Sequence, residues 1–442
     1  MHPIEGILET FDYDFLILVV GFLIIVGGTF YFFSPLFFAV PIGLFLSTYP
    51  FWLPIALSFT FWFFWVDYVQ SMYIKKQEHT LLEIFLPRDI YKSPLAMEVA
   101  ISGLHIEKGA STWYDRYILG KVLPNWSFEI ASIEGHLHFY IWCRRGFKDL
   151  VEAQFYGQYP GIEIQEVPDY TTAIPYYDRT KMGMWGNEFK FKQPDPYPIR
   201  TYVDYGLEKD PKEEFKIDPL TSVLEFMASI GKGEQVWLQI VTRAHRKRHK
   251  KGTFWQNATW REEGEELIRQ KIKELKQEAQ TEEGGWSWSR IPTKGEAEVL
   301  AAIDRNTSKL PFSVGMRVVY IAYTPEARDY FAKTRVARVH PLINIMKPFN
   351  SFSLNNIQPT SYIDFDYPWE DFRRLREHML CKRTLARYRL RAFFHAPYKK
   401  NNLLMSTEEL ATIYHFPGGV LQAPTISRVL SKKVEPPGNL PR

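Results

Sequence analysis

Hydrophobic residues are concentrated at the start of the chain. The first 74 residues are mostly apolar and contain no lysine or arginine. Residues 15–33 and 36–66 are two uncharged runs, and Pro41, Pro50 and Pro54 interrupt the second. A helix that crosses the roughly 30 Å hydrocarbon core of a bilayer needs about 20 apolar residues. The pattern therefore predicts a transmembrane region over residues 1–76.

The distribution of charge predicts the orientation of this region. All 54 lysine and arginine residues lie at or after Lys75, whereas five acidic residues precede it. Cytoplasmic flanks of membrane spans are rich in lysine and arginine, so Lys75 and Lys76 predict that the main domain is cytoplasmic.

The acidic N-terminus lacks the basic segment of a signal peptide. We therefore expect a multi-pass protein of the inner (cytoplasmic) membrane. The second run fits one broken helix or a short hairpin, which leaves two or three crossings open.

Residues 80–169 follow strand and helix patterns in the order β-α-β-β-α-β. The predicted strands cover 81–88, 127–133, 136–144 and 161–170, and the predicted helices cover 93–105 and 147–160. Ser93 and Pro94 suit the N-cap and the first position of a helix, and Glu134-Gly135 suits a hairpin turn. This order is that of the split β-α-β, or ferredoxin-like, arrangement. It predicts a first α+β domain over residues 77–175.

A similar order follows with a longer insertion. Strands are predicted over 197–206, 234–244, 312–324 and 386–397, and helices over 218–231, 295–306 and 326–347. A charged insertion over 246–295 contains a predicted helix at 261–280. These segments predict a second α+β domain over 190–400, so the expected fold class is α+β with two tandem ferredoxin-like units. Residues 401–442 predict a short helix and then an extended linker without a core of its own.

Motifs that carry catalysis are absent from the sequence. There is no G-x-x-x-x-G-K-[ST] loop, no G-x-S-x-G elbow and no H-E-x-x-H helix. His136 and His138 share one face of a predicted strand but lack a third ligand at suitable spacing, so neither a metal site nor a cofactor is predicted. Cys143 and Cys381 lie far apart and do not predict a disulfide framework. We therefore expect a protein that is not an enzyme.

Two basic clusters are the candidate binding residues. The first contains Arg243, Arg246, Lys247, Arg248, Lys250, Lys251 and Trp255. The second contains Arg387, Arg389 and Arg391, which alternate along the predicted strand 386–397 and would share one face. Such residues suit nucleic acid, because lysine and arginine side chains neutralise phosphates. An aromatic ring can also stack on an exposed nucleobase. They equally suit anionic lipid headgroups, and a solvated loop is the plainer interpretation of the first cluster.

Four segments resemble a known family. They are KSPLAMEVAISGLH (92–105), NWSFEIASIEGHLHFYIW (125–142), VEAQFYGQYPGIEI (151–164) and STEELATIYHFPGGVLQAPTISRVLSKKVEPPGNLP (406–441). They resemble the membrane-anchored N-terminal region of bacterial type IV secretion coupling ATPases of the TraG/HerA kind, and the resemblance covers most of the chain from about residue 80. In such proteins a RecA-like DNA-translocating ATPase follows this region. Its nucleotide-binding residues have no counterparts in this sequence, so the resemblance implies that the ATPase is a separate chain or is missing from this one.

The resemblance implies a membrane-anchored, non-catalytic scaffold of a type IV secretion-like, conjugation or DNA-translocation machine. Its expected partners are membrane lipid, a P-loop translocase ATPase, DNA, and further copies of itself in a homo-oligomer such as a hexamer. An alternative is a self-assembling structural membrane protein whose cytoplasmic domains have no nucleic-acid role. A third interpretation, a membrane enzyme, would require a catalytic site in the cleft between the two α+β units.

Overall fold

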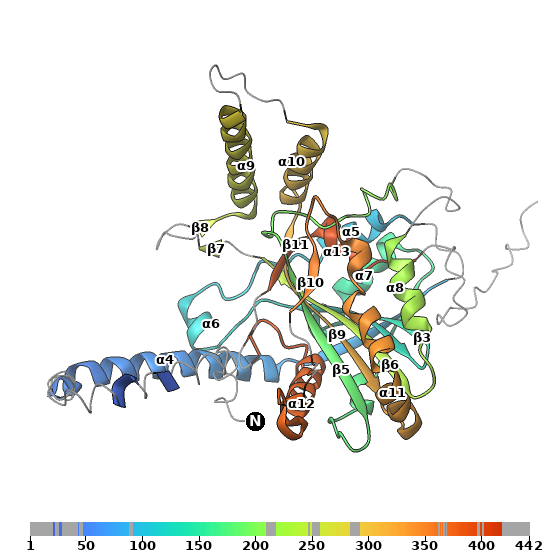
Figure 1. The fold of residues 1–442 in the computed structure, drawn as a ribbon, viewed down its shortest axis with the longest axis horizontal. Helices are drawn as coiled ribbons and strands as arrows, with labels where there is room; N and C mark the ends of the chain where they lie inside the picture. The colour runs from blue at the N-terminus through green and yellow to red at the C-terminus, as the bar shows by residue number, and fades with distance from the viewer. Residues whose placement is uncertain are drawn as a thin grey trace, which may run out of the picture. The chain divides into compact units, whose positions relative to one another are not determined.

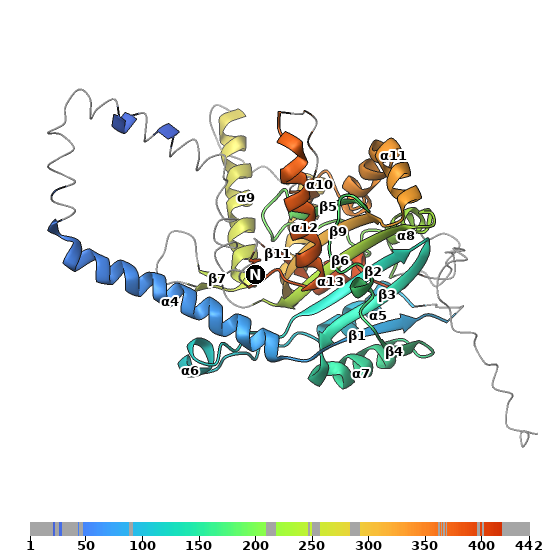
Figure 2. The same cartoon turned by 90° about the horizontal axis from the view of Figure 1, so that it is seen from below.

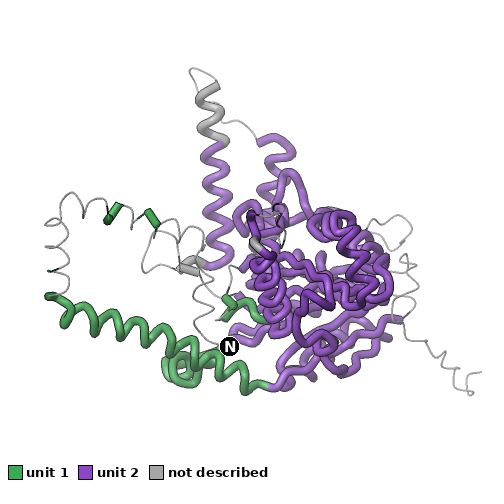
Figure 3. The backbone as a smooth tube through the Cα atoms, turned by 60° about the horizontal axis from the view of Figure 1, so that its bottom comes forward, with its two compact units in different colours: residues 1–77, 108–122, 392–400 green, residues 78–107, 123–391, 401–442 purple. Residues whose placement is uncertain are grey.

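The computed structural model describes residues 47–87, 92–208, 218–245, 257–282, 292–360, 369–395 and 402–417, together with shorter pieces of the segments between them (Figure 1). These residues form two compact units (Figure 3). Unit 1 comprises residues 1–77, 108–122 and 392–400, and unit 2 comprises residues 78–107, 123–391 and 401–442. The chain therefore passes between the units several times.

Unit 1 contains a long apolar helix, α4 (Tyr49–Lys76). Pro50 lies in its first turn, where a missing N–H removes no helical hydrogen bond, and the helix continues through Pro54. Among the residues that the structure describes, α4 is the one helix long and apolar enough to cross a membrane, and its most apolar stretch has no buried residue. The chain therefore makes no hairpin turn at Pro50 or Pro54. The predicted span at 15–33 and the segment around Pro41 lie largely outside the described residues.

The first half of unit 2 has the predicted order of elements. It contains β1 (His79–Phe85), α5 (Pro94–Ser102), β2 (Trp126–Ile133), β3 (His136–Arg144), α7 (Lys148–Gln158) and β4 (Glu163–Val167). The hydroxyl of Ser93 caps α5 by accepting a hydrogen bond from the Leu95 N–H. Glu134 and Gly135 both have positive φ, at 52° and 88°, as a tight hairpin turn requires. The strands pair antiparallel in the order β4-β1-β3-β2.

The second half of unit 2 extends the same sheet. It contains β5 (Gly183–Phe191), α8 (Pro219–Ala228), β6 (Glu234–Ala244), β9 (Pro311–Ala322), α11 (Pro325–Ile343) and β10 (Ile357–Pro359). Its strands pair in the order β10-β5-β9-β6, and β6 pairs antiparallel with β2 from Trp126↔Thr242 to Ile133↔Gln235. With β11 (Leu403–Ser406) on β9, the result is one nine-stranded sheet in an α+β fold (Figures 1 and 2).

Two predicted strands of the second half are wrong. Residues 197–206 form turns rather than a strand, and β5 occupies the expected place in the sheet. The start of the predicted strand 386–397 belongs instead to a helix, α12 (Leu375–Arg389), and the edge strand is β10. The alternation of arginine with apolar residues misled the prediction, because three alternating positions are too few to distinguish a strand from the end of a helix.

The charged insertion and the C-terminal segment add further elements. The insertion contains β7 (Arg248–His249), β8 (Asn257–Ala258), α9 (Trp260–Glu282) and α10 (Lys294–Thr307). After β11 the chain forms α13 (Thr407–Ile413), in which every residue is buried. The predicted short helix is confirmed as α13. β11, α13, Tyr414 and Phe416 belong to the main core, which the sequence did not predict. Residues 418–442 lie outside the described residues.

Helices cover both faces of the sheet. Phe331 of α11 packs on Tyr320, whereas Tyr388 of α12 packs on Trp237. Tyr320 pairs with Val236 across the β6–β9 ladder, and Val236 and Trp237 point to opposite faces because successive strand residues alternate. Helices α11 and α12 therefore lie on opposite faces, and both faces of the second half contribute to the core.

Candidate functional site

The first basic cluster lies mostly outside the described residues. This applies to Arg246, Lys247, Lys250, Lys251 and Trp255. Arg248 belongs to the short strand β7. Arg243 lies near the end of β6 and is half-buried, and burial lowers its pKa to about 10. The structure therefore places the beginning of this cluster at one end of the central sheet.

The second basic cluster is not a cationic strand face. Arg387 and Arg389 are in the last turn of α12, and Arg391 follows it with a φ of 47°. Arg387 is buried and lies 3.8 Å from a carboxylate oxygen of Glu188. Arg389 donates a hydrogen bond to the carbonyl of Pro175. The three arginines lie close together in the sequence at the end of α12, but the side chains of Arg387 and Arg391 are buried.

Arg391 is the centre of a buried ion network. Its side chain is 1% exposed, and its Nε and Nη2 lie 3.0 and 3.1 Å from the two carboxylate oxygens of Glu129. Its Nη1 and Nη2 also donate to Asp169. Burial alone would lower the pKa of Arg391, but the two carboxylates raise it well above its ordinary value. The network fixes the end of α12 on the sheet, which is a structural role.

A separate pocket lies between the helical insertion and the body of unit 2. Its volume is about 870 Å³, and its lining combines residues of α9 and α10 with residues of two loops. The charged residues of the lining are Arg200, Asp204, Lys271, Glu274, Glu296, Glu298 and Arg305. Both signs of charge are thus present, so the pocket suits a polar ligand or peptide rather than a purely anionic one.

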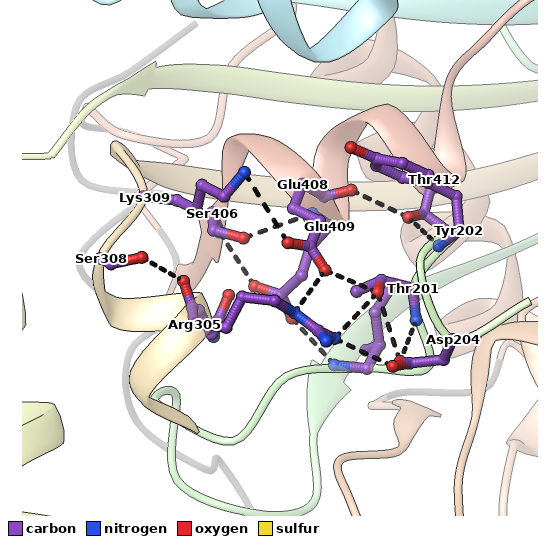
Figure 4. Close-up of polar contacts among 12 residues, drawn as sticks. Thr201, Tyr202, Asp204, Arg305, Ser308, Lys309, Ser406, Glu408, Glu409 and Thr412 are labelled. Atoms are coloured by element: carbon purple, nitrogen blue, oxygen red, sulfur yellow. Dashed lines mark hydrogen bonds and ion pairs between the residues drawn. The ribbon is translucent and has the colours of Figure 1, made fainter. Parts of the chain in front are cut away.

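Two residues that line the pocket, Asp204 and Arg305, also belong to a polar cluster beside α13, which we call the cluster under α13 (Figure 4). Arg305 of α10 lies 2.9 Å from Asp204 and 3.2 Å from Glu408 of α13. Glu408 also accepts a 2.6 Å hydrogen bond from the hydroxyl of Thr201. Burial raises the pKa of Glu408, although Thr201 and Arg305 act in the opposite direction. Arg305 therefore joins the pocket to a carboxylate on the buried C-terminal helix.

Two further carboxyl groups complete this cluster. Glu409 is fully buried and accepts hydrogen bonds from the backbone N–H groups of Ile199 and Ser406, at 3.0 and 2.9 Å. Burial nevertheless raises the pKa of Glu409 to about 8. Glu98 of α5 lies 2.7 Å from the ammonium of Lys309. The cluster therefore joins α5, α10 and α13.

The described cysteine and acidic side chains supply neither a reactive thiol nor a metal-ligand cluster. Burial raises the pKa of both Cys143 and Cys381 to about 12, so neither is a thiolate nucleophile at neutral pH. Within the described parts of the chain, no group of three or more His, Cys, Asp or Glu side chains is placed to hold a metal ion. The polar atoms at the pocket instead form ion pairs that fix helices to one another.

Sequence reasoning missed the cluster under α13 although one signal was present. Ser406 and Glu409 have the S-x-x-E spacing of a capping box, and the structure shows both hydrogen bonds of that box. The spacing predicts where the helix begins, but it does not predict that Glu408 and Glu409 are buried, because acidic residues in a first helical turn are usually exposed.

Comparison with known proteins gives one family. A search of curated proteins found no match to this chain. Residues 113–428, well over half of the chain, match the sequence model of a family described as a domain of unknown function, DUF8128. The matched range covers most of unit 2, including the pocket, the Arg391 network and α13. The chain therefore belongs to the DUF8128 family.

Proposed function

We propose that this protein is a membrane-anchored, non-catalytic scaffold of a DNA-translocation or type IV secretion-like machine, and that it holds a HerA/TraG-type ATPase at the membrane. The observation that carries the proposal is α4. Residues 49–66 of this helix are uncharged and largely exposed, and at 1.5 Å per residue they extend over about 27 Å. Exposed apolar surface costs about 25 cal/mol per Å² in water, whereas a bilayer removes that cost.

The charges that flank α4 support the proposed orientation. The helix ends at Lys75 and Lys76, and unit 2 begins two residues later. Lysine and arginine next to a membrane span favour the cytoplasmic side. We therefore assign unit 2, which follows Lys75 and Lys76, to the cytoplasmic side of the inner membrane. The uncharged run at residues 15–33 supports a further crossing and hence a multi-pass anchor.

The strand orders support a further part of the proposal, that unit 2 consists of two tandem ferredoxin-like units. Each half of the sheet has its fourth strand at one edge, then its first, third and second strands. Each half also supplies its helices after the first and third strands, apart from the insertion between β6 and β9. Two such units joined through β2 and β6 give a continuous platform on which other subunits can assemble.

The partner ATPase is proposed from the resemblance of residues 406–441 to the segment that precedes the ATPase in TraG/HerA-type proteins. The buried position of α13 supports this part of the proposal, because Glu408 and Glu409 hold the start of that segment in the core. A partner that binds the residues after Pro417 would thus be attached to unit 2 through a fixed helix.

Affinity isolation of the full-length protein from its native membranes tests the proposal. We expect the protein to stay in the membrane fraction after alkaline carbonate extraction, and a P-loop ATPase to co-purify in mild detergent. A variant without residues 418–442 retains α13 and should lose the ATPase while it stays in the membrane. Recovery in the soluble fraction would contradict the anchor. Recovery of homo-oligomers without an ATPase would favour a self-assembling structural protein instead.

The proposed contact with DNA is tested by its dependence on salt. Replacing Arg246, Lys247, Arg248, Lys250 and Lys251 with glutamine should weaken DNA binding and reduce the slope of log K against log salt, because fewer counterions are released. The matched control replaces five basic residues of α9 with glutamine: Arg261, Arg269, Lys271, Lys273 and Lys276. Equal loss in both variants would indicate a general charge effect and would remove the assignment of DNA binding to residues 246–251.

A further inference from the structure

A short helix in unit 1 has no role in the anchor described so far. This helix, α6 (Trp113–Tyr117), lies in the excursion 108–122, which leaves unit 2 after α5 and returns before β2. Its N-cap, Thr112, accepts a hydrogen bond from the Asp115 N–H, and Lys121 forms a 2.8 Å ion pair with Asp115. These contacts lie within residues 108–122 and stabilise the helical turn of α6. This turn fixes the positions of its aromatic residues.

The excursion packs directly on α4. The ring of Trp62 lies 5.2 Å from that of Tyr117, and the indole N–H of Trp65 donates a 2.8 Å hydrogen bond to the Tyr117 carbonyl. Gly120 has a φ of +65°, and a Cβ at this position would be only 2.3 Å from the carbonyl oxygen of Val69. Glycine therefore permits backbone-to-backbone contact between the excursion and α4. The contacts extend from Trp62 to Val69, about two helical turns.

This part of α4 is where its uncharged sequence ends. No charged residue occurs between Asp14 and Asp67. If α4 crosses the bilayer, as the proposed function requires, Asp67 marks the limit of the hydrocarbon core, because an ionised carboxylate is strongly disfavoured inside it. The residues of α4 that contact the excursion lie on both sides of that limit. The excursion is therefore beside the boundary between acyl chains and headgroups.

The surface that α6 presents at this level is aromatic and exposed. Trp113 is 61% exposed and Tyr114 is 57% exposed, although both are large apolar rings. On α4, Phe61 and Tyr68 are exposed beside the contact with α6, at 64% and 58%. Tryptophan and tyrosine prefer the membrane interface, because their rings favour the acyl side and their polar atoms favour the headgroups.

We propose that residues 108–122 form a second membrane contact, in which α6 lies in the bilayer interface and inserts Trp113 and Tyr114 between lipid headgroups. The proposal rests on the proposed membrane anchor. The partner is the lipid bilayer itself, because the exposed rings of α6 continue the exposed apolar surface of α4. Arg116 lies on the same short helix and is exposed, so it is available to lipid phosphates.

The proposed insertion gives residues 108–122 a role outside unit 2. A single helix can tilt and rotate in the bilayer. A second contact made by Trp113 and Tyr114 fixes the rotation of α4 about its axis, since the excursion is attached to one side of that helix. Burial of the two rings at the interface also removes an exposed aromatic patch that would otherwise contact water.

The experiment uses an environment-sensitive fluorophore attached to single introduced cysteines in the full-length protein, reconstituted in phosphatidylcholine vesicles. The native Cys143 and Cys381 are buried and do not compete in the folded protein. Three positions are labelled, one per variant: Tyr114→Cys in α6, Phe59→Cys in α4, and Val336→Cys on the exposed surface of α11 in unit 2. Quenching is measured with phosphatidylcholine brominated on the acyl chain and, separately, with aqueous iodide.

We expect the label at position 114 to be quenched by brominated lipid and protected from iodide, as the label at position 59 should be. The label at position 336 should respond to iodide alone. If position 59 is quenched by lipid but position 114 responds to iodide alone, or to neither quencher, the second contact is refuted while the anchor stands. If position 59 also responds to iodide alone, the anchor itself is refuted.

Discussion

Replacing Arg391 with methionine tests whether the buried ion network holds α12 on the sheet. Methionine keeps the aliphatic part of the side chain but removes the guanidinium. The carboxylate of Glu129, which is fully buried, would then lose both of its contacts with Arg391. Three neutral donors remain to Glu129, from Ser127, Tyr170 and Gln239.

The expected loss follows from the burial of the two carboxylates. Removal of one partner of a buried ion pair costs about 3 to 5 kcal/mol. The Asp169 side chain is 30% exposed and keeps its hydrogen bonds from Thr171, so solvent reduces its share of the loss. Most of the penalty therefore belongs to Glu129. We expect the free energy of unfolding to fall by about 3 to 5 kcal/mol.

Urea unfolding of the protein in detergent, followed by tryptophan fluorescence, measures this change. The matched control is Arg389→Met, which removes a hydrogen bond from a partly exposed arginine and should cost about 1 kcal/mol. The double variant Glu129→Gln with Arg391→Met should cost less than the two single changes combined, because it leaves no unpaired buried charge. Equal midpoints for Arg391→Met and Arg389→Met, or simple additivity in the double variant, would refute the reasoning.

Three further outcomes are expected. Burial raises the pKa of Glu409 from 4.5 to about 8, so the folded state binds this proton more tightly than the unfolded state. Stability should therefore fall as pH rises from about 4.5 to 8, by on the order of 5 kcal/mol, and Glu409→Gln should flatten that slope in urea midpoints measured from pH 5 to 9. Gly120→Ala should destabilise the packing of residues 108–122 on α4, because its Cβ would meet the Val69 carbonyl. Limited proteolysis should therefore cleave residues 108–122 faster than in a Gly146→Ala control, in which the added Cβ has no atom within 4 Å. Cys143 and Cys381 should react with iodoacetamide only after unfolding, since burial raises the pKa of both thiols to about 12, and rapid modification of the native protein would contradict their placement.

Much of the sheet was predictable from local patterns. The hairpin of β2 and β3 was found because Glu134-Gly135 separates two apolar runs, and β6 and β9 were found because their residues are buried on both faces. β5 was missed because Gly183, Gly186 and Asn187 weaken its strand pattern. Gly186 is needed because a Cβ there would be 2.9 Å from Thr384 of α12. The sequence of β5 alone does not predict that a helix from a distant part of the chain approaches it so closely.

The surroundings of the candidate binding residues were harder to predict than the strands. Arginines at 387, 389 and 391 predicted an exposed cationic face, because an isolated sequence does not show which carboxylates are nearby. The partners Glu188, Glu129 and Asp169 come from positions more than 190 residues earlier in the chain. Charge patterns predict surfaces well only when the charges are solvated, and Arg391 is paired in the core instead.

The pairing of β2 with β6 has a consequence for synthesis of the protein on the ribosome. β2 is complete at Ile133, but the strand that covers its edge ends only at Ala244. At about 5 to 20 residues per second, the edge of β2 would wait roughly 5 to 20 s for its partner. An unpaired edge that contains Trp126, Phe128 and Ile130 is prone to join strands of other chains. The nascent first half therefore requires shielding, for example by a chaperone, until the second half has been made.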